Sequence, residues 1–136
     1  MTEVTEEKPV VLDWPEAMNQ VGGDKEFLAE VLQDLTEEAK TAEEDIQKAI
    51  QAKDFEAIMK AAHRIKGSAT YLGCAALRNS SFAIQQLGHD GGSAGSDKEA
   101  LLTSIETEYQ NFLSALTDLK AEIERWNREE GAASDT

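Results

Sequence analysis

Four residues near the middle of the chain have the types and the spacing needed for covalent chemistry on a helix surface. They are His63, Lys66, Gly67 and Thr70, which stand at positions i, i+3, i+4 and i+7 and so lie along one helical ridge. A neutral imidazole keeps a lone pair on one ring nitrogen, which makes His63 a candidate nucleophile near neutral pH. Lys66 stands one turn later, where its ammonium could reach the oxygens of a transferred phosphoryl group. The pattern therefore indicates a histidine that carries a phosphoryl group.

The ridge of His63 lies beside the expected core rather than on it. Four apolar residues are displaced from the ridge by one position, or about 100° around a helix: Ala62, Ile65, Ala69 and Leu72. We therefore expect the imidazole at the edge of the core, directed to solvent. A glycine in the interior of a helix, such as Gly67, lowers helix stability by about 1 kcal/mol relative to alanine. Its missing side chain would let a second protein approach His63. The alternative is an ordinary surface histidine with a neighbouring lysine and a packing glycine.

A glutamine further along the chain is a candidate partner of the imidazole. If the chain turns at Cys74 between two antiparallel helices, His63 and Gln85 are level, because each lies eleven residues from the turn. The amide of Gln85 could then hydrogen-bond the imidazole or a phosphoryl oxygen. Gln86 is the alternative partner if the turn is displaced by one residue, and a plain solvated role stays open for both glutamines.

Apolar residues recur at helical spacing almost throughout, and strict alternation of the strand type is absent, which predicts an all-α protein. Asp13 should cap a short first helix that ends at Gly22 and Gly23. Asp24 should cap a long second helix that stops near Lys53. Its predicted buried stripe is Phe27, Val31, Leu35, Ala39, Ala42, Ile46, Ala49 and Ile50.

Three further helices are expected after Asp54. The third ends at Gly73, in the left-handed conformation common at helix ends, and its predicted buried face is Phe55, Ile58, Ala62, Ile65, Ala69 and Leu72. The fourth passes through Leu77, Ile84 and Leu87. A mobile loop over 88–96 follows, and Ser96 and Glu99 have the spacing of a capping box for the final helix. The predicted face of that helix is Leu102, Ile105, Tyr109, Phe112, Leu116, Leu119, Ile123 and Trp126.

These elements predict an antiparallel up-and-down four-helix bundle with a short additional N-terminal helix over one end. The bundle domain is expected over 12–128, between a flexible acidic tail at 1–11 and a disordered tail at 129–136. A chain of 136 residues has room for one such domain and not for separate catalytic and cofactor domains.

Charge and composition exclude several classes of function. The chain has 13 basic and 27 acidic side chains and a net charge of −14, which disfavours binding to nucleic acids and to anionic membrane surfaces. No apolar run is long enough to span a bilayer, the N-terminus lacks the pattern of a signal peptide, and a lone Cys74 cannot form an internal disulfide. We therefore expect a cytoplasmic protein; nuclear shuttling stays open.

The charge is unevenly distributed along the chain. Residues 1–54 carry 5 basic and 15 acidic side chains, residues 55–90 carry 4 and 2, and residues 91–136 carry 4 and 10. Both histidines, His63 and His89, fall in the electropositive middle. A local basic patch on an acidic protein suits a small anionic group or an acidic partner surface, although acidic solvated faces on the flanking segments would give the same asymmetry.

Two other kinds of chemistry lack their signatures. Di-metal bundles use a Glu three residues before each ligating His, but Lys60 and Gln86 occupy those positions here. The stretch GGSAGSDK lacks the Gly-Lys-Ser/Thr ending of a phosphate-binding loop and is not preceded by a strand. The sequence thus indicates neither a metal centre nor a nucleotide site.

The segment AHRIKGSATYLG, from Ala62 to Gly73, resembles the signature of the histidine-containing phosphotransfer (HPt) domain. That signature has a His, an aliphatic residue two later, then Lys-Gly-Ser, and a Leu/Ile-Gly pair near the end of the helix. LDWPEAMNQVGGDKEFLAEVLQDL and LRNSSFAIQQLGH are similar to the neighbouring helices of such domains. The resemblance implies a four-helix bundle in which His63 accepts a phosphoryl group from one receiver-domain aspartate and passes it to another.

The resemblance also implies roles for the residues around His63. Lys66 would stabilise the phosphohistidine, Gln85 would hydrogen-bond the imidazole or the phosphoryl group, and Mg²⁺ would belong to the receiver, because the carrier needs no cofactor of its own. The partners would be the receiver domains of a hybrid histidine kinase and of a response regulator, and the carrier would be a monomer without ATP-dependent kinase activity. The expected docking residues are Arg64, Gly67, Ser68, Thr70 and His89.

Two other classes of function remain as alternatives. A helical adaptor would bind receiver domains or partner helices without phosphoryl chemistry. A small hydrolase would use His63 as a general base, but that role needs a pocket with a nucleophile or a positioned water. A solvent-directed histidine on a bundle face is poorly placed for it.

Overall fold

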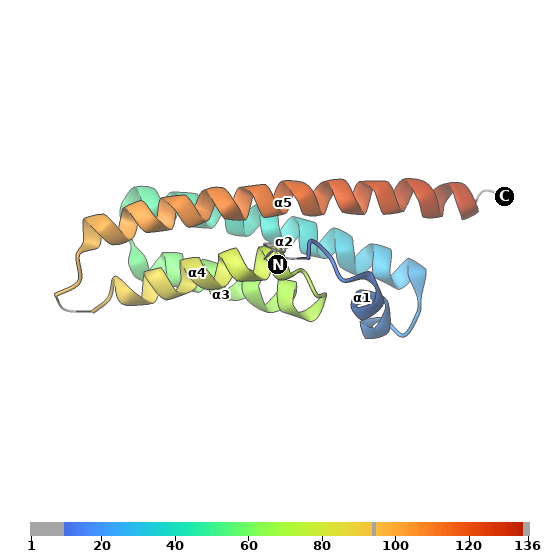
Figure 1. Cartoon of the computed structure of the whole chain (residues 1–136), viewed down its shortest axis with the longest axis horizontal. Coiled ribbons are helices and arrows are strands. Elements are labelled where there is room, and N and C mark those ends of the chain that lie inside the picture. Colours follow the sequence, from blue (N-terminus) through green and yellow to red (C-terminus); the bar gives the residue numbers. More distant parts are fainter. Residues whose placement is uncertain (1–9, 94, 135–136) are drawn as a thin grey trace, which may run out of the picture.

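The computed structural model describes residues 10–93 and 95–134, with only the backbone described for 131–134. Over these described residues the chain forms five helices: α1 Trp14–Gln20, α2 Lys25–Ala52, α3 Phe55–Tyr71, α4 Ala75–Asp90 and α5 Lys98–Ser134. Figure 1 shows α2 to α5 side by side with alternating directions. Each of these four packs against its neighbours in the chain, and α2 also packs against α5, which closes the bundle. The predicted four-helix bundle with a short additional N-terminal helix is confirmed.

Aspartates begin the first three helices, as predicted. The side chains of Asp13, Asp24 and Asp54 each accept a hydrogen bond at 3.0 to 3.1 Å from the backbone N–H three residues later. These bonds satisfy donors that have no partner within the helix. Gly73 follows α3 with a φ of 73°, the left-handed conformation expected there.

The buried face of α2 differs from the prediction over its first two turns. Phe27 is 49% exposed and Val31 is only half-buried, whereas Leu28 and Leu32 are fully buried. Successive steps of four residues advance 400° and drift around the helix, so a stripe extended backwards from Leu35 by such steps reaches solvent. The observed core residues alternate steps of four and three, which keeps them facing the other helices.

The predicted faces of α3 and α5 are confirmed. All six residues predicted on α3 are buried, and on α5 only Leu102 and Trp126 of the predicted set are half-buried rather than buried. These two helices supply apolar side chains to one continuous core. Burial of that apolar surface is the main stabilising contribution to a bundle of this kind.

The connection between α4 and α5 begins later than predicted. Gly88 is not in a loop but is buried within α4, which continues to Asp90. A Cβ at position 88 would lie 2.9 Å from the backbone N of Met59, so the missing side chain allows α4 to approach α3 closely. The rest of the expected 88–96 loop follows from Gly91, and its residue 94 lies outside the described residues.

The predicted capping box at the start of α5 is wrong. Asp97 caps this helix, because its carboxylate accepts a hydrogen bond of 3.1 Å from the backbone N–H of Ala100. The hydroxyl of Ser96 instead donates to the carbonyl of Ser93 at 2.8 Å, within the preceding turn. An aspartate one position later than the serine competes successfully for the capping role.

The final helix is longer than predicted. α5 continues through Ser134, so the tail expected to be disordered from 129 is helical up to that residue. Glu129 and Glu130 are good helix formers, and Glu130 forms an ion pair of 2.9 Å with Lys25 of α2. Of the expected terminal tails, residues 1–9 and 135–136 lie outside the described residues.

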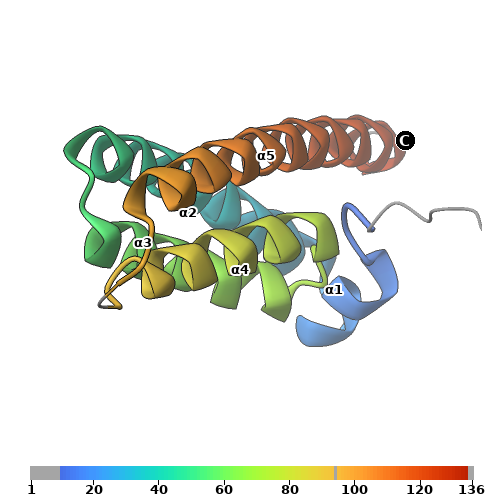
Figure 2. The same ribbon diagram turned by 60° about the vertical axis from the view of Figure 1, so that its left-hand side comes forward.

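The short helix α1 covers the end of the bundle where α3 turns into α4 (Figure 2). Asp13 donates its backbone N–H to the carbonyl of Gly73 at 3.1 Å. The indole of Trp14 stacks on Trp126 of α5 with ring centroids 5.3 Å apart and donates to Glu122 at 2.8 Å. None of the helices in the described ranges has an apolar stretch long enough to cross a membrane.

Candidate functional site

The imidazole of His63 projects from the exposed surface of α3, next to the buried Ala62. Its Nδ1 lies 3.3 Å from Oε1 of Gln85 on α4. Gln85 is therefore the glutamine that contacts the ring, and Gln86 is exposed beside it. The expected turn at Cys74, which directly precedes α4, accounts for this pairing.

The contact with Gln85 determines which ring nitrogen of His63 is available. An amide oxygen only accepts hydrogen bonds, so Nδ1 carries the proton of the neutral ring in this contact. Nε2 then holds the lone pair. The glutamine thus selects the tautomer in which the nitrogen farther from the backbone is nucleophilic.

Lys66 lies one turn after His63 on the same helix, as predicted, and its side chain is half-buried. Its Nζ is 5.2 Å from the ring centroid of Phe82 on α4, within the range of a cation–π contact. The sequence analysis missed Phe82. The signal was its spacing: Phe82 precedes Gln85 by three residues, as His63 precedes Lys66.

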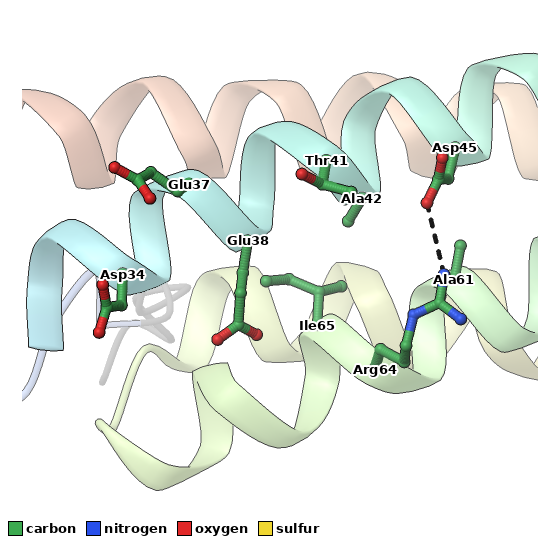
Figure 3. A pocket seen from close by; sticks show the side chains of 9 residues that line it. All are labelled: Asp34, Glu37, Glu38, Thr41, Ala42, Asp45, Ala61, Arg64 and Ile65. Atoms are coloured by element: carbon green, nitrogen blue, oxygen red, sulfur yellow. Dashed lines mark hydrogen bonds and ion pairs between the residues drawn. The ribbon is translucent and has the colours of Figure 1, made fainter.

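Two other cations near His63 are held by carboxylates. Arg64 forms an ion pair of 3.4 Å with Asp45 on α2, which Figure 3 shows as a contact across the groove between α2 and α3. Lys60 is paired with Glu56 on its own helix at 2.9 Å. Among the residues that the structure describes, no carboxylate lies within ion-pair distance of Lys66, so its charge is the one left available to an anion.

Gly67 is exposed on α3, and a Cβ built on it meets no atom within 4 Å other than the adjacent backbone of its own helix. The missing side chain is therefore not required by packing within this chain, in contrast to Gly88. A glycine in a helix interior lowers helix stability by about 1 kcal/mol relative to alanine. Among the described residues, no packing contact at this position accounts for that cost.

Two of the remaining predicted site residues, Ser68 and Thr70, lie on α3, and the third, His89, lies on α4. Thr70 is exposed and donates its hydroxyl to the carbonyl of Lys66 at 2.8 Å. Ser68 donates to Glu38 of α2 at 2.6 Å, so its hydroxyl points to the second helix rather than to the imidazole. His89 is exposed on α4, one turn beyond Gln85.

His63 lines one hollow, and its neighbour Arg64 also lines a second. One of about 350 Å³ is lined by Met59, Lys60, His63, Arg64 and Gln85. The other, of about 460 Å³, is the groove in Figure 3, where carboxylates of α2 face Arg64 and Ile65 of α3. Its acidic side chains are Asp34, Glu37, Glu38 and Asp45. Arg64, next to His63 in the chain, therefore lines both the hollow at the imidazole and a strongly acidic groove.

Comparison with known proteins shows the family to which the chain belongs. The family model of the Hpt domain matches residues 30–127. The chain therefore belongs to the Hpt domain family, the phosphotransfer intermediates of His-Asp phosphorelays, which exchange phosphoryl groups with receiver domains.

Two solved structures share the fold. The HPT domain from the Hpt sensor hybrid histidine kinase of Shewanella is 19% identical with a TM-score of 0.58, and the match covers 88% of this chain and 95% of that chain. Histidine-containing phosphotransfer protein B (HptB) from Pseudomonas aeruginosa PAO1 is also 19% identical, with a TM-score of 0.61 and coverage of 84% and 95%. No curated protein sequence matches the chain.

Proposed function

We propose that Nε2 of His63 accepts a phosphoryl group from the aspartyl phosphate of one receiver domain and passes it to an aspartate of a second receiver. One observation carries this proposal: an exposed imidazole whose Nδ1 contacts the amide oxygen of Gln85, which in the neutral ring places the lone pair on Nε2, the nitrogen open to a partner. An aspartyl phosphate is an activated donor, so a neutral imidazole suffices as nucleophile.

The transfer step balances without a proton acceptor. The lone pair of Nε2 attacks phosphorus, the new P–N bond forms as the bond to the aspartate oxygen breaks, and the aspartate leaves as a carboxylate. The ring keeps its proton on Nδ1, and Gln85 accepts that hydrogen bond before and after transfer. The second step is the reverse reaction with a different aspartate. Catalysis of this kind depends on positioning and on neutralising the phosphoryl oxygens.

Two neighbours of His63 have distinct roles in this proposal. Lys66 neutralises charge on the transferred phosphoryl group, because its ammonium is on the same ridge and has no carboxylate partner among the described residues. Gly67 leaves open space in which the receiver approaches the helix. The docking surface around them comprises Arg64, Ser68, Thr70 and His89.

The protein acts as a carrier without ATP-dependent kinase activity in this proposal. It has no cofactor of its own, and the receiver supplies Mg²⁺ next to the phosphoryl group, where the metal neutralises developing charge. We further propose that the carrier is a cytoplasmic monomer. Light scattering of the purified chain tests the monomer, and incubation with ATP and Mg²⁺ alone should leave the protein unlabelled.

The central experiment is transfer from a panel of phosphorylated receiver domains in Mg²⁺, followed by intact mass. Wild type should gain about 80 Da in an adduct that is labile to acid and stable to base. His63→Gln should gain nothing while its helical circular dichroism is unchanged. His89→Gln, labelled with the small donor phosphoramidate so that receiver docking does not enter, is the matched control, because it removes the other exposed histidine and should still be labelled.

The outcomes separate the classes of function. Labelling of His63→Gln, or loss of phosphoramidate labelling in His89→Gln alone, would show that His63 is not the acceptor. Receiver binding without an adduct on wild type would identify an adaptor instead. Lys66→Ala should form the adduct more slowly or lose it faster, and unchanged kinetics in both directions would argue against its role.

A further inference from the structure

Phe82 on α4 is a large apolar side chain that remains 46% exposed. The ammonium of Lys66 lies over its ring at 5.2 Å from the centroid. The negative face of an aromatic ring attracts a cation at this distance. The exposed phenyl ring thus has a specific neighbour, and that neighbour belongs to the phosphoryl site.

Lys66 differs from the other cations of the site in what restrains it. Carboxylates hold Arg64 and Lys60 in ion pairs of 3.4 and 2.9 Å, whereas the ring of Phe82 is the group that faces the ammonium of Lys66. A lysine side chain has a flexible four-carbon stem, so an unrestrained ammonium samples many positions. A carboxylate would restrain it too, but it would also neutralise the charge that a phosphoryl group requires. An aromatic face restrains the ammonium and leaves its charge in place.

The register of α3 against α4 places Phe82 where its ring can restrain the Lys66 ammonium. Gln85 contacts His63, and Phe82 contacts Lys66. Lys66 follows His63 by three residues on α3, and Phe82 precedes Gln85 by three residues on the antiparallel α4. The same face of α4 therefore orients the nucleophile with an amide and the cation with a ring. Both contacts hold their groups on the side of α3 that faces α4.

We propose that Phe82 is a positioning residue of the phosphotransfer site, which preorganises the Lys66 ammonium for the phosphoryl group on His63. This inference rests on the proposed function of His63 and Lys66. Preorganisation lowers the entropy lost when the ammonium engages the phosphoryl oxygens. Phe82 itself touches neither the phosphoryl group nor the reacting nitrogen in this proposal.

The test measures the isolated phosphoprotein, so that receiver docking does not enter. Wild type, Phe82→Leu and Phe82→Trp are phosphorylated with phosphoramidate, freed of donor, and followed by intact mass as the adduct hydrolyses. Phe82→Leu keeps an apolar side chain but loses the ring, and its adduct should hydrolyse about two- to fivefold faster, the effect of one exposed cation–π contact. Phe82→Trp keeps an aromatic face and should retain the wild-type lifetime. Phe27→Leu removes an equally exposed phenylalanine elsewhere and is the matched control.

A double-mutant cycle distinguishes positioning from a merely structural role. In a Lys66→Met background the ammonium is absent, so Phe82→Leu should cause no further change in the hydrolysis rate. An equal effect of Phe82→Leu in both backgrounds, an unchanged lifetime, or a longer lifetime would each overturn the proposal. If Phe82→Leu loses helical circular dichroism, phenylalanine with a fluorinated ring at position 82 replaces it, since fluorine weakens the negative face at nearly constant shape.

The failure of this inference is separable from that of the proposed function. If His63→Gln is unlabelled and Lys66→Met shortens the adduct lifetime, while Phe82→Leu does not, the carrier stands and the role of Phe82 is refuted. If Lys66→Met itself leaves the lifetime unchanged, the assigned role of Lys66 fails, and the inference about Phe82 fails with it.

Discussion

Gly67 offers a test in which stability and function should change in opposite directions. Replacing it with alanine adds a Cβ that meets no atom within 4 Å other than the adjacent backbone of its own helix, in a helical segment whose backbone any residue can adopt. Alanine favours a helix interior over glycine by about 1 kcal/mol. Gly67→Ala should therefore stabilise the isolated protein by about that amount, which raises the Tm by about 4 °C for a domain of this size.

The same substitution should impair phosphotransfer. The methyl group occupies space that the receiver uses, and adding one methylene-sized group to a close-packed contact costs about 1–3 kcal/mol. The rate of transfer from the receiver should fall by about five- to 150-fold. Labelling by phosphoramidate, a small donor, should change little, because that reagent needs no protein contact.

Gly88→Ala is the matched control for stability. Its Cβ would lie 2.9 Å from the backbone N of Met59 and 3.0 Å from the carbonyl of Phe55, atoms that cannot move without shifting α3. The overpacking cost of about 1–3 kcal/mol exceeds the gain in helix propensity, so a net loss of about 1 kcal/mol is expected.

Thermal unfolding by circular dichroism and transfer from a phosphorylated receiver measure the two effects in the same samples. A Gly67→Ala variant that is more stable and transfers at the wild-type rate would refute the assignment of this glycine to partner approach. A less stable variant would refute the argument from open space. Equal stability changes in Gly67→Ala and Gly88→Ala would show that the packing distinction between the two glycines is wrong.

Three other predictions concern the hydrogen bond to the imidazole, the α1–α5 contact and the buried thiol. Gln85→Leu should slow phosphoryl acceptance about two- to tenfold, the effect of one hydrogen bond, whereas Gln86→Leu should not, in the same transfer assay. The Trp14 hydrogen bond, helped by Arg125, lowers the pKa of Glu122 against an opposing effect of burial. The stabilisation that the ionised Glu122 carboxylate gains from these partners is present above its unfolded pKa near 4.5 and is lost as the pH falls through its lower folded pKa. The Tm difference between wild type and Trp14→Phe should therefore shrink in that acidic range. A Tm difference independent of pH would contradict this prediction. Burial raises the pKa of Cys74 to about 12, so iodoacetamide at pH 8 should label only the denatured protein.

Features set by local sequence were predictable. Asp13, Asp24 and Asp54 cap their helices because an aspartate side chain reaches a backbone N–H three residues later, whatever the tertiary structure. The pairing of His63 with Gln85 was predictable for a related reason, because a tight turn between two antiparallel helices fixes which residues are level. The signature around His63 then indicated the family.

Features set by contacts between helices were not predictable in the same way. Phe27 and Leu28 are neighbouring large apolar residues, and only the position of α2 against the other helices decides which is buried. Gly88 has the composition of the loop that follows it, although its close contact with α3 makes it a helical packing residue. The contact of Glu38 with Ser68 likewise depends on the relative placement of α2 and α3.

The geometry of the site depends on the turn between α3 and α4 more than on either helix alone. Lys66 and Phe82 each lie eight residues from Cys74, as His63 and Gln85 each lie eleven, so one turn sets both contacts. α1 packs onto this turn, where a Cβ at Gly73 would lie 2.7 Å from Cβ of Asp13. The stacked indoles of α1 and α5 hold α1 in that position. The N-terminal helix therefore stabilises the register on which the nucleophile and its neighbouring cation depend, although it packs at the C-terminal end of α3, about two turns from His63.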